Sequence, residues 1–144
     1  MIKIVTDSTA YVTSEYADAH DIKVVPLYII TKNDTIKEGF PGSFDDIFES
    51  IIKEEETIKS SQPSPESFKS AFDEILKEGN EVVCITISSS LSGTYNSAVL
   101  AAKMYAKNVY FSGGDYKQDY DYSFGLTAII LDLQVIANRK LEEE

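Results

Sequence analysis

The sequence has a single cysteine, a single histidine and no apolar run long enough to span a membrane. One cysteine cannot form an intramolecular disulfide. Because Cys84 lies inside an apolar run, we expect a buried, inert thiol. One cysteine and one histidine, without a spaced cluster of further ligands, give no support for a metal site. The start, Met1 to Val5, is too short for a signal peptide, so we expect a cytoplasmic protein with no membrane insertion.

Basic residues are also scarce, since 13 Lys and Arg stand against 24 Asp and Glu and give a formal charge of -11. This balance argues against binding to nucleic acid or to anionic membrane surfaces, which both attract basic patches. It does not exclude a small anionic ligand, because a local cluster of donors can hold one carboxylate. The 144 residues are 43% hydrophobic, which suits one folded domain with one core.

Short apolar runs alternate with segments of helical periodicity along the chain. The predicted strands are Ile2–Val5, Val24–Ile30 with Pro26 interrupting it, Val82–Ile87 and Val109–Phe111. The predicted helices are Ser14–His20, Phe44–Ile52, one from Pro65 to Gly79, one that begins near Thr94 with Tyr95, Ala98, Val99 and Ala102 buried, and Phe124–Asn138. This alternation predicts a three-layer α/β/α fold with a mostly parallel sheet. The tyrosine-rich segment from Tyr105 to Tyr122 is expected to be largely an irregular loop.

Three hydroxyl-rich segments are expected to gather beyond the carboxyl ends of the strands, where ligands of open α/β sheets bind. They are Asp7-Ser8-Thr9, Ser60-Ser61-Gln62 and the run from Ser88 to Thr94. The last segment joins a buried strand to a helix, so backbone N–H groups and the positive end of the helix point at it. Ser92 and Thr94 add hydroxyl donors, and Gly93 would let a ligand approach the backbone. The pattern suits a carboxylate or a phosphate, although the same residues could serve only as helix caps.

Four motifs, taken in order, resemble the DegV family. They are Asp7-Ser8-Thr9, Val24-Val25-Pro26-Leu27, Ser60-Ser61-Gln62-Pro63-Ser64 and Ser88-Ser89-Ser90-Leu91-Ser92-Gly93-Thr94-Tyr95. The resemblance covers Met1 to about Ala106 and then weakens, although Ser123-Phe124-Gly125-Leu126 resembles the family's next helix start. It implies the N-terminal domain of a fatty-acid-binding protein of that family.

The resemblance implies a carrier and not an enzyme, with no cofactor. Family members bind one long-chain fatty acid and present its carboxylate to a partner fatty acid kinase. The residues implied in ligand binding are Asp7, Ser8, Ser60, Ser61, Ser92, Gly93 and Thr94. Serine stands at position 60 where the family usually has threonine, which keeps the hydroxyl donor. We expect residues 1–144 to form a single lipid-binding domain without the family's second, closing domain. That second domain supplies a histidine to the head-group site, and His20 does not match its position.

An open site should hold a lipid weakly. Complete burial of about 14 methylenes of an acyl chain, at about 0.8 kcal/mol each, would contribute about 11 kcal/mol of binding free energy. An open groove that covers only half of the acyl chain leaves about 5–6 kcal/mol before association costs. The predicted helix Phe124–Asn138 is apolar around much of its girth. It is either a central core helix or a helix that faces a second domain or a second protomer, and we expect a homo-oligomer contact through Leu131 and Val135.

Three other functions stay open at this point. A serine hydrolase is disfavoured because Ser90-Leu91-Ser92-Gly93-Thr94 lacks the glycine that precedes the serine in a nucleophile elbow, and nothing places His20 near it. A phosphate-binding module lacks the Gly-x-x-x-x-Gly-Lys pattern. The main alternative is a truncated protein-interaction module that keeps the fold without binding lipid.

Overall fold

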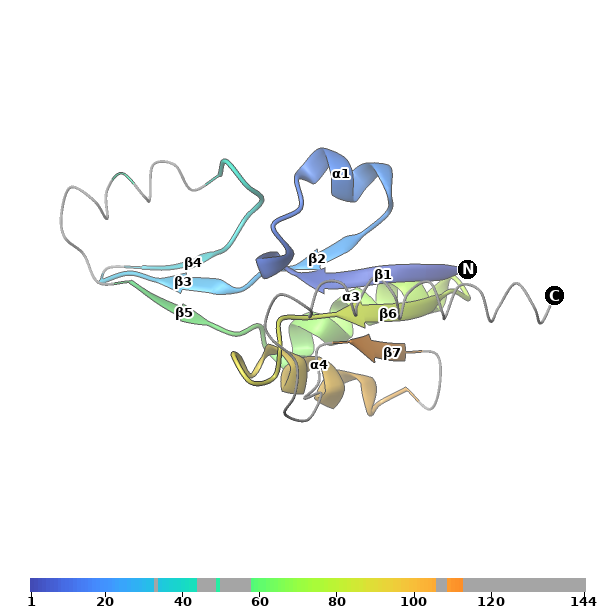
Figure 1. The fold of residues 1–144 in the computed structure, drawn as a ribbon. Coiled ribbons are helices and arrows are strands. Elements are labelled where there is room, and N and C mark those ends of the chain that lie inside the picture. The colour runs from blue at the N-terminus through green and yellow to red at the C-terminus, as the bar shows by residue number, and fades with distance from the viewer. Residues whose placement is uncertain (33, 44–48, 50–57, 106–108, 113–144) are drawn as a thin grey trace, which may run out of the picture. The chain divides into compact units, whose positions relative to one another are not determined.

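A computed structural model of the chain describes residues 1–32, 34–43, 49, 58–105 and 109–112. All of them belong to one compact unit, Met1–Gly114 (Figure 1). The elements in chain order are β1 (Ile2–Asp7), the 3-10 helix η1 (Ser8–Ala10), α1 (Ser14–Ala19), β2 (Lys23–Val25), β3 (Tyr28–Ile30), β4 (Thr35–Lys37), β5 (Lys59–Ser61), α3 (Pro65–Lys77), β6 (Glu81–Ile85), α4 (Thr94–Ala102) and β7 (Val109–Ser112). None of the described helices has the length and apolar character needed to cross a membrane.

Four strands form a parallel sheet in the order β2-β1-β6-β7. Val5 lies beside Cys84 in the register of β1 and β6. Along β6, Val82, Val83 and Cys84 are all buried, as expected for a parallel strand that is covered on both faces. The predicted α/β class with a mostly parallel sheet is therefore confirmed.

The predicted strand Val24–Ile30 is wrong as a single element. Pro26 has no backbone N–H to donate to a neighbouring strand, and the chain leaves the parallel sheet there. β2 ends at Val25, and β3 begins a second, antiparallel sheet in the order β4-β3-β5. This small sheet, which the sequence patterns did not predict, extends beyond the carboxyl end of β1 in Figure 1.

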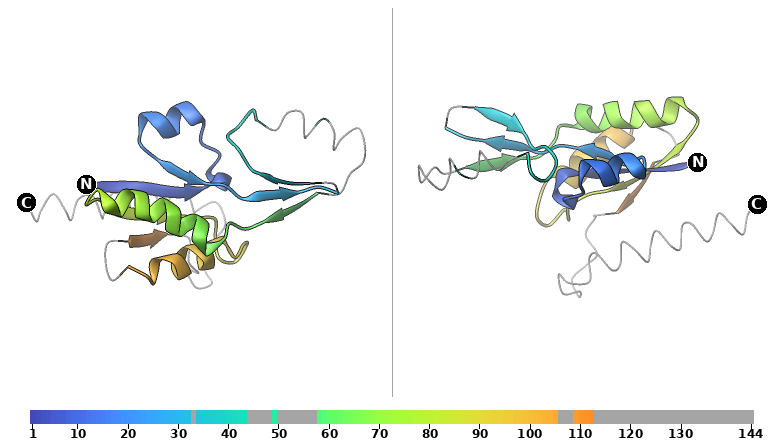
Figure 2. Two further views of the ribbon diagram at one scale, coloured as in Figure 1. Left: turned by 180° about the vertical axis from the view of Figure 1, so that it is seen from behind. Right: turned by 90° about the horizontal axis from the view of Figure 1, so that it is seen from above.

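Helix α3 has the caps that its sequence predicts. The Ser64 hydroxyl accepts from Ser67 N at 3.2 Å, Pro65 occupies the first turn, and Gly79 follows the helix with a φ of +75°. Phe68, Ala71 and Phe72 are buried on the stripe that the periodicity predicts. The view from behind shows α3 lying along the parallel sheet (Figure 2).

Helix α4 buries a different stripe from the one predicted. Its buried residues are Thr94, Ser97, Ala98 and Ala101, whereas Tyr95, Val99 and Ala102 are only half-buried. Small side chains allow α4 to pack closely against α3. Because most of α4 is apolar, its periodicity could not single out the buried face.

The core confirms the expectation for Cys84. It lies among Val5, Phe72 and Val82 in the buried cluster between the parallel sheet and α3. Burial raises the pKa of its thiol, and the nearby Asp7 charge adds to the shift. A thiol that stays protonated is a poor nucleophile, so Cys84 is a packing residue.

Lys69, Asp73 and Tyr105 form a polar cluster at the edge of this core. Lys69 Nζ donates to Asp73 Oδ2 at 2.6 Å, and the Tyr105 hydroxyl donates to Oδ1 at 2.7 Å. These bonds, the one from Lys69 first, lower the pKa of the Asp73 carboxyl. The cluster therefore contributes stability above the pKa that Asp73 has in the unfolded chain, and this contribution is lost as pH falls through the folded-state pKa.

An NMR titration of the Asp73 carboxyl tests this cluster. We expect its midpoint to rise in Tyr105→Phe, which keeps the ring that packs against Phe72, and to rise further in Lys69→Met. A midpoint that stays unchanged in both variants would contradict the hydrogen-bonding pattern. An exposed Glu66→Gln substitution at the start of α3 is the control and should leave the Asp73 midpoint in place.

Several predictions fall partly or wholly outside the described residues. They are the helix Phe44–Ile52, the helix Phe124–Asn138 with its oligomer contact, and most of the irregular loop from Tyr105 to Tyr122. Within that loop the structure describes a half-buried Tyr105 and the strand β7, so the loop prediction is wrong there. His20 is described: it ends α1, is exposed, and lies with its ring 4.3 Å from that of Tyr16. His20 is therefore a surface residue.

Candidate functional site

Asp7 ends β1 and is completely buried. Its carboxylate accepts from Thr9 N at 2.8 Å, from the Thr9 hydroxyl, and from Ile87 N at 2.7 Å. Ile87 begins the loop that follows β6, the neighbour of β1 in the sheet. The carboxylate therefore connects two strand-end segments that lie 80 residues apart in the sequence.

Ser8 makes a second connection of this kind. Its hydroxyl donates to the Glu38 carboxylate and accepts from Leu27 N at 2.9 Å. Leu27 O in turn accepts from Glu38 N at 2.8 Å. These bonds join the end of β1 to the point where the chain enters the antiparallel sheet. The polar atoms of Asp7 and Ser8 are thus engaged within the protein, and their contact with a ligand stays a prediction.

The loop after β6 folds back on itself before α4. Leu91 N and Ser92 N both donate to Ser88 O, at 3.0 and 3.1 Å. The hydroxyls of half-buried Ser92 and buried Thr94 lie 2.9 Å apart. The N-cap of α4 is Gly93, and no side chain there makes a capping hydrogen bond. Ser92 Oγ also accepts from Thr94 N, the first residue of α4, at 3.3 Å. The hydroxyls are thus gathered at the start of α4, and that of Ser92 also bonds the first backbone N–H of the helix.

The register of the antiparallel sheet gives β5 two different faces. Ser60 lies opposite Ile29, which lies opposite Ile36, so a hydroxyl and two half-buried isoleucines share one face. Ser61 lies opposite Tyr28 on the other face, and Tyr28 lies opposite Lys37. Ser60 itself is exposed, and Ser61 is half-buried. The face that carries Ser60 therefore combines a hydrogen-bond donor with apolar surface.

Gln62 brings the end of β5 against the start of α4. A Cβ atom added to Gly93 would lie 2.7 Å from Cδ and 2.8 Å from Nε2 of Gln62, so the carboxamide rests directly on the glycine. Nε2 also donates to Ser97 Oγ at 3.1 Å. The sequence predicted that Gly93 makes room for a ligand, whereas in the structure it makes room for Gln62. Nothing in the sequence pattern marked Gln62 for this contact, which only the fold creates.

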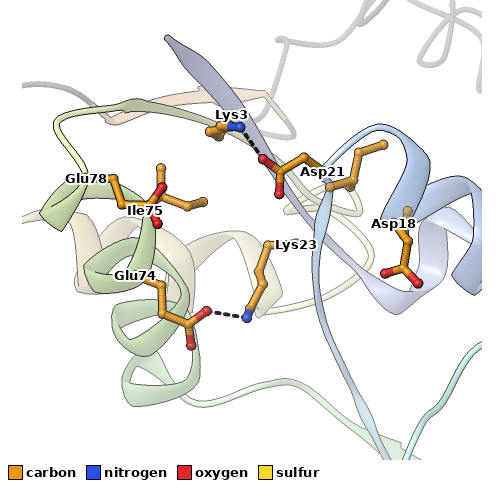
Figure 3. A pocket seen from close by; sticks show the side chains of 9 residues that line it. Lys3, Asp18, Asp21, Lys23, Glu74, Ile75 and Glu78 are labelled. Carbon is orange, nitrogen blue, oxygen red and sulfur yellow. Dashed lines mark hydrogen bonds and ion pairs between the residues drawn. The ribbon is translucent and has the colours of Figure 1, made fainter.

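A separate charged hollow of about 340 Å³ lies at the opposite ends of the strands. Lys3 near the start of β1 pairs with Asp21, and Lys23 at the start of β2 pairs with Glu74, as Figure 3 shows. The hollow also includes Ala17 and Ile75. None of the residues predicted to bind a ligand lines it, so it is distinct from the hydroxyl-rich segments.

The predicted residues thus fall into three groups in the structure. Asp7 and Ser8 hold strand-end segments together, and Ser92, Gly93 and Thr94 surround the start of α4. Ser60 and Ser61 lie on β5, which Gln62 connects to Gly93. That Ser60 and Ser92 bind the same head group stays a prediction.

Comparisons with known proteins show which family and fold the chain resembles. Residues 1–116 match a family model described as "Uncharacterised protein, DegV family". A DegV domain-containing protein of Staphylococcus aureus is 39% identical over 106 residues, which cover 74% of this chain and 38% of the relative. A fatty acid-binding protein of Thermotoga maritima is 39% identical over 105 residues, which cover 71% of this chain and 36% of that protein.

Solved structures show the same similarity. A stearic acid-binding protein from Eubacterium ventriosum has a TM-score of 0.70 at 31% identity, covering 78% of this chain and 41% of that one. DegV from Bacillus subtilis, a fatty acid binding protein, has a TM-score of 0.69 at 32% identity, covering 79% and 40%. The chain spans about two fifths of the length of these proteins. On the match of its first 116 residues, the chain belongs to the DegV family.

Proposed function

We propose that this chain is a non-enzymatic carrier of a long-chain fatty acid, which presents the bound carboxylate to a partner fatty acid kinase. The relatives named for fatty acid binding support the class of ligand. The observation that carries the proposal is the row Ser60–Ile29–Ile36 across the antiparallel sheet. It sets a hydroxyl donor beside apolar side chains, as a ligand with an acidic head and a hydrocarbon tail requires.

The head group is proposed to lie between this row and the start of α4. Ser92 and Thr94 supply hydroxyls, and the start of α4 adds the positive end of the helix dipole. Ser60 supplies a hydroxyl from β5, and Ser61 lies next to it in the chain. Asp7 and Ser8 contribute by holding the loops in place, since their polar atoms already have partners within the protein. Ile29 and Ile36 would contact the first part of the acyl chain.

The geometry supports a carrier better than a hydrolase. A serine nucleophile needs an adjacent base, and His20 lies at the end of α1 against Tyr16. The carboxylate of a bound fatty acid would instead accept hydrogen bonds from neutral donors, which orient it without reacting with it. Phosphorylation would then be carried out by the partner.

The substitution Ser92→Ala tests the proposed head-group site. Fatty acid is supplied as palmitate or as its uncharged methyl ester, and the binding of each is measured by titration. We expect the wild-type chain to prefer palmitate, and Ser92→Ala to weaken palmitate binding about tenfold while affecting the ester little. Loss of the acid-over-ester preference is a signature that a general loss of structure would not produce.

Ser70→Ala is the matched control, because Ser70 is exposed on α3. It should bind palmitate as the wild type does. Mass spectrometry of an organic extract from the purified protein provides an independent measurement. A chain that carries no fatty acid and takes none up on titration would contradict the carrier proposal and favour a protein-interaction module.

A further inference from the structure

We infer that Gln62 is a positioning residue of the head-group site, which fixes the spacing between the strand that carries Ser60 and the loop that carries Ser92. The inference rests on the proposed function and adds to it a residue that does not itself bind the ligand. It follows from the contact that the Gln62 carboxamide makes with two residues of the α4 entry, Gly93 and Ser97.

The first contact explains why residue 93 has no side chain. Gly93 has a φ of -71°, which every residue type adopts, so its backbone conformation does not require glycine. The restriction comes from Gln62, whose Oε1, Cδ and Nε2 occupy the space that a Cβ atom would need. A side chain at position 93 would therefore displace the exposed Gln62 carboxamide from the α4 entry.

The second contact fixes the direction of the carboxamide. Nε2 donates to Ser97 Oγ at 3.1 Å, and Ser97 is only 3% exposed. Ser97 N donates to Gly93 O at 3.0 Å, so the glycine and the serine bracket the first turn of α4. The carboxamide thus lies across that turn, and a shift of Gln62 would break its hydrogen bond to Ser97.

The backbone of Gln62 is constrained as well. The buried Pro63 follows it, and a residue before proline is held in an extended conformation. Side chains of an extended chain alternate between its two sides, so Gln62 and Ser60 point to the same side. Gln62 points at Gly93, which directs the Ser60 hydroxyl toward the side on which the α4 entry lies. Gln62 therefore sets both the distance between Ser60 and Ser92, the two proposed head-group donors, and the side toward which the Ser60 hydroxyl points.

A double-mutant cycle on the full chain tests this inference. Gly93→Ala and Gln62→Ala both displace the same carboxamide, the first by crowding it and the second by removing it. We expect each to weaken palmitate binding about five- to tenfold, and the double variant to weaken it by no more than either alone. Independent effects would instead multiply to about 25- to 100-fold. Multiplying effects, or a wild-type affinity in both single variants, would overturn the inference.

A second measurement separates this inference from the proposed function. In NMR spectra of the ligand-free chain, Gly93→Ala and Gln62→Ala should shift the amide resonances of Ser60 and Ser61 as well as that of Ser92. The control Asn96→Ala, an exposed amide on the same turn of α4, should leave Ser60 and Ser61 in place. A wild type that binds no palmitate would contradict the proposed function alone. Unmoved Ser60 and Ser61 resonances would overturn the role of Gln62.

Discussion

Asparagine in place of Asp7 should lower the free energy of unfolding by about 2–4 kcal/mol. The carboxylate accepts on Oδ1 from Thr9 and on Oδ2 from Ile87 N, with no exposure to water. An asparagine side chain has only one acceptor oxygen, so its NH2 group takes the place of the other carboxylate oxygen and faces a backbone N–H. A buried donor opposed to a second donor loses its hydrogen bond and cannot regain it from solvent. Urea unfolding of the two proteins gives the difference.

The control for this experiment is Asp18→Asn, which makes the same chemical change at an exposed position of α1. We expect it to stay within about 0.5 kcal/mol of the wild type. If Asp7→Asn were equally mild, the bond between the carboxylate and Ile87 N would not be holding the two strand ends together. A large loss confined to Asp7 supports its place as a structural residue beneath the site.

Alanine in place of Phe72 should destabilise the fold further, by about 3–5 kcal/mol. Its ring is completely buried, lies 6.1 Å from that of Phe68, and meets the edge of Tyr105 at 6.2 Å. Removing it leaves a cavity between α3 and the parallel sheet, and the loss is a large part of the total stability of a small domain. Calorimetry or urea unfolding measures the change.

Phe72→Leu separates the cavity from the loss of the aromatic ring, since leucine fills most of the same volume. We expect it to cost clearly less than Phe72→Ala. The exposed Leu100→Ala on α4 should change stability little. Equal costs for Phe72→Ala and Leu100→Ala would show that Phe72 is not at the centre of the core.

The parallel sheet and its helices could be predicted because their signals are local. β6 is a continuous apolar run, and α3 carries a serine cap, an N-terminal proline and a C-terminal glycine. The antiparallel sheet could not be predicted in the same way. β4 and β5 are three residues long, too short to show a period, and they exist as strands because β3 lies between them.

The candidate site could likewise be predicted only where its signals are local in the sequence. The hydroxyl-rich segments could be recognised in the sequence because serine and threonine cluster there, although the structure places Ser60 and Ser61 within strand β5 and not in a loop. Their internal partners were not visible. The bonds of Asp7 to Ile87 and of Gln62 to Ser97 join residues far apart in sequence, so no spacing rule predicts them. The buried face of α4 was predicted incorrectly for another reason. Close packing against the neighbouring elements buries small residues, whereas the prediction by hydrophobicity favoured larger ones.

The two serines of β5 affect how the antiparallel sheet responds to a shift in strand register. Sliding β5 by one residue against β3 would exchange its faces. Because positions 60 and 61 are both serine, the isoleucine face would still present a hydroxyl after such a slip. The carboxamide two residues beyond Ser60 would turn away from the glycine it rests on. The contact of the Gln62 carboxamide therefore distinguishes the correct register of β5 from the shifted one, whereas the hydroxyls of Ser60 and Ser61 do not.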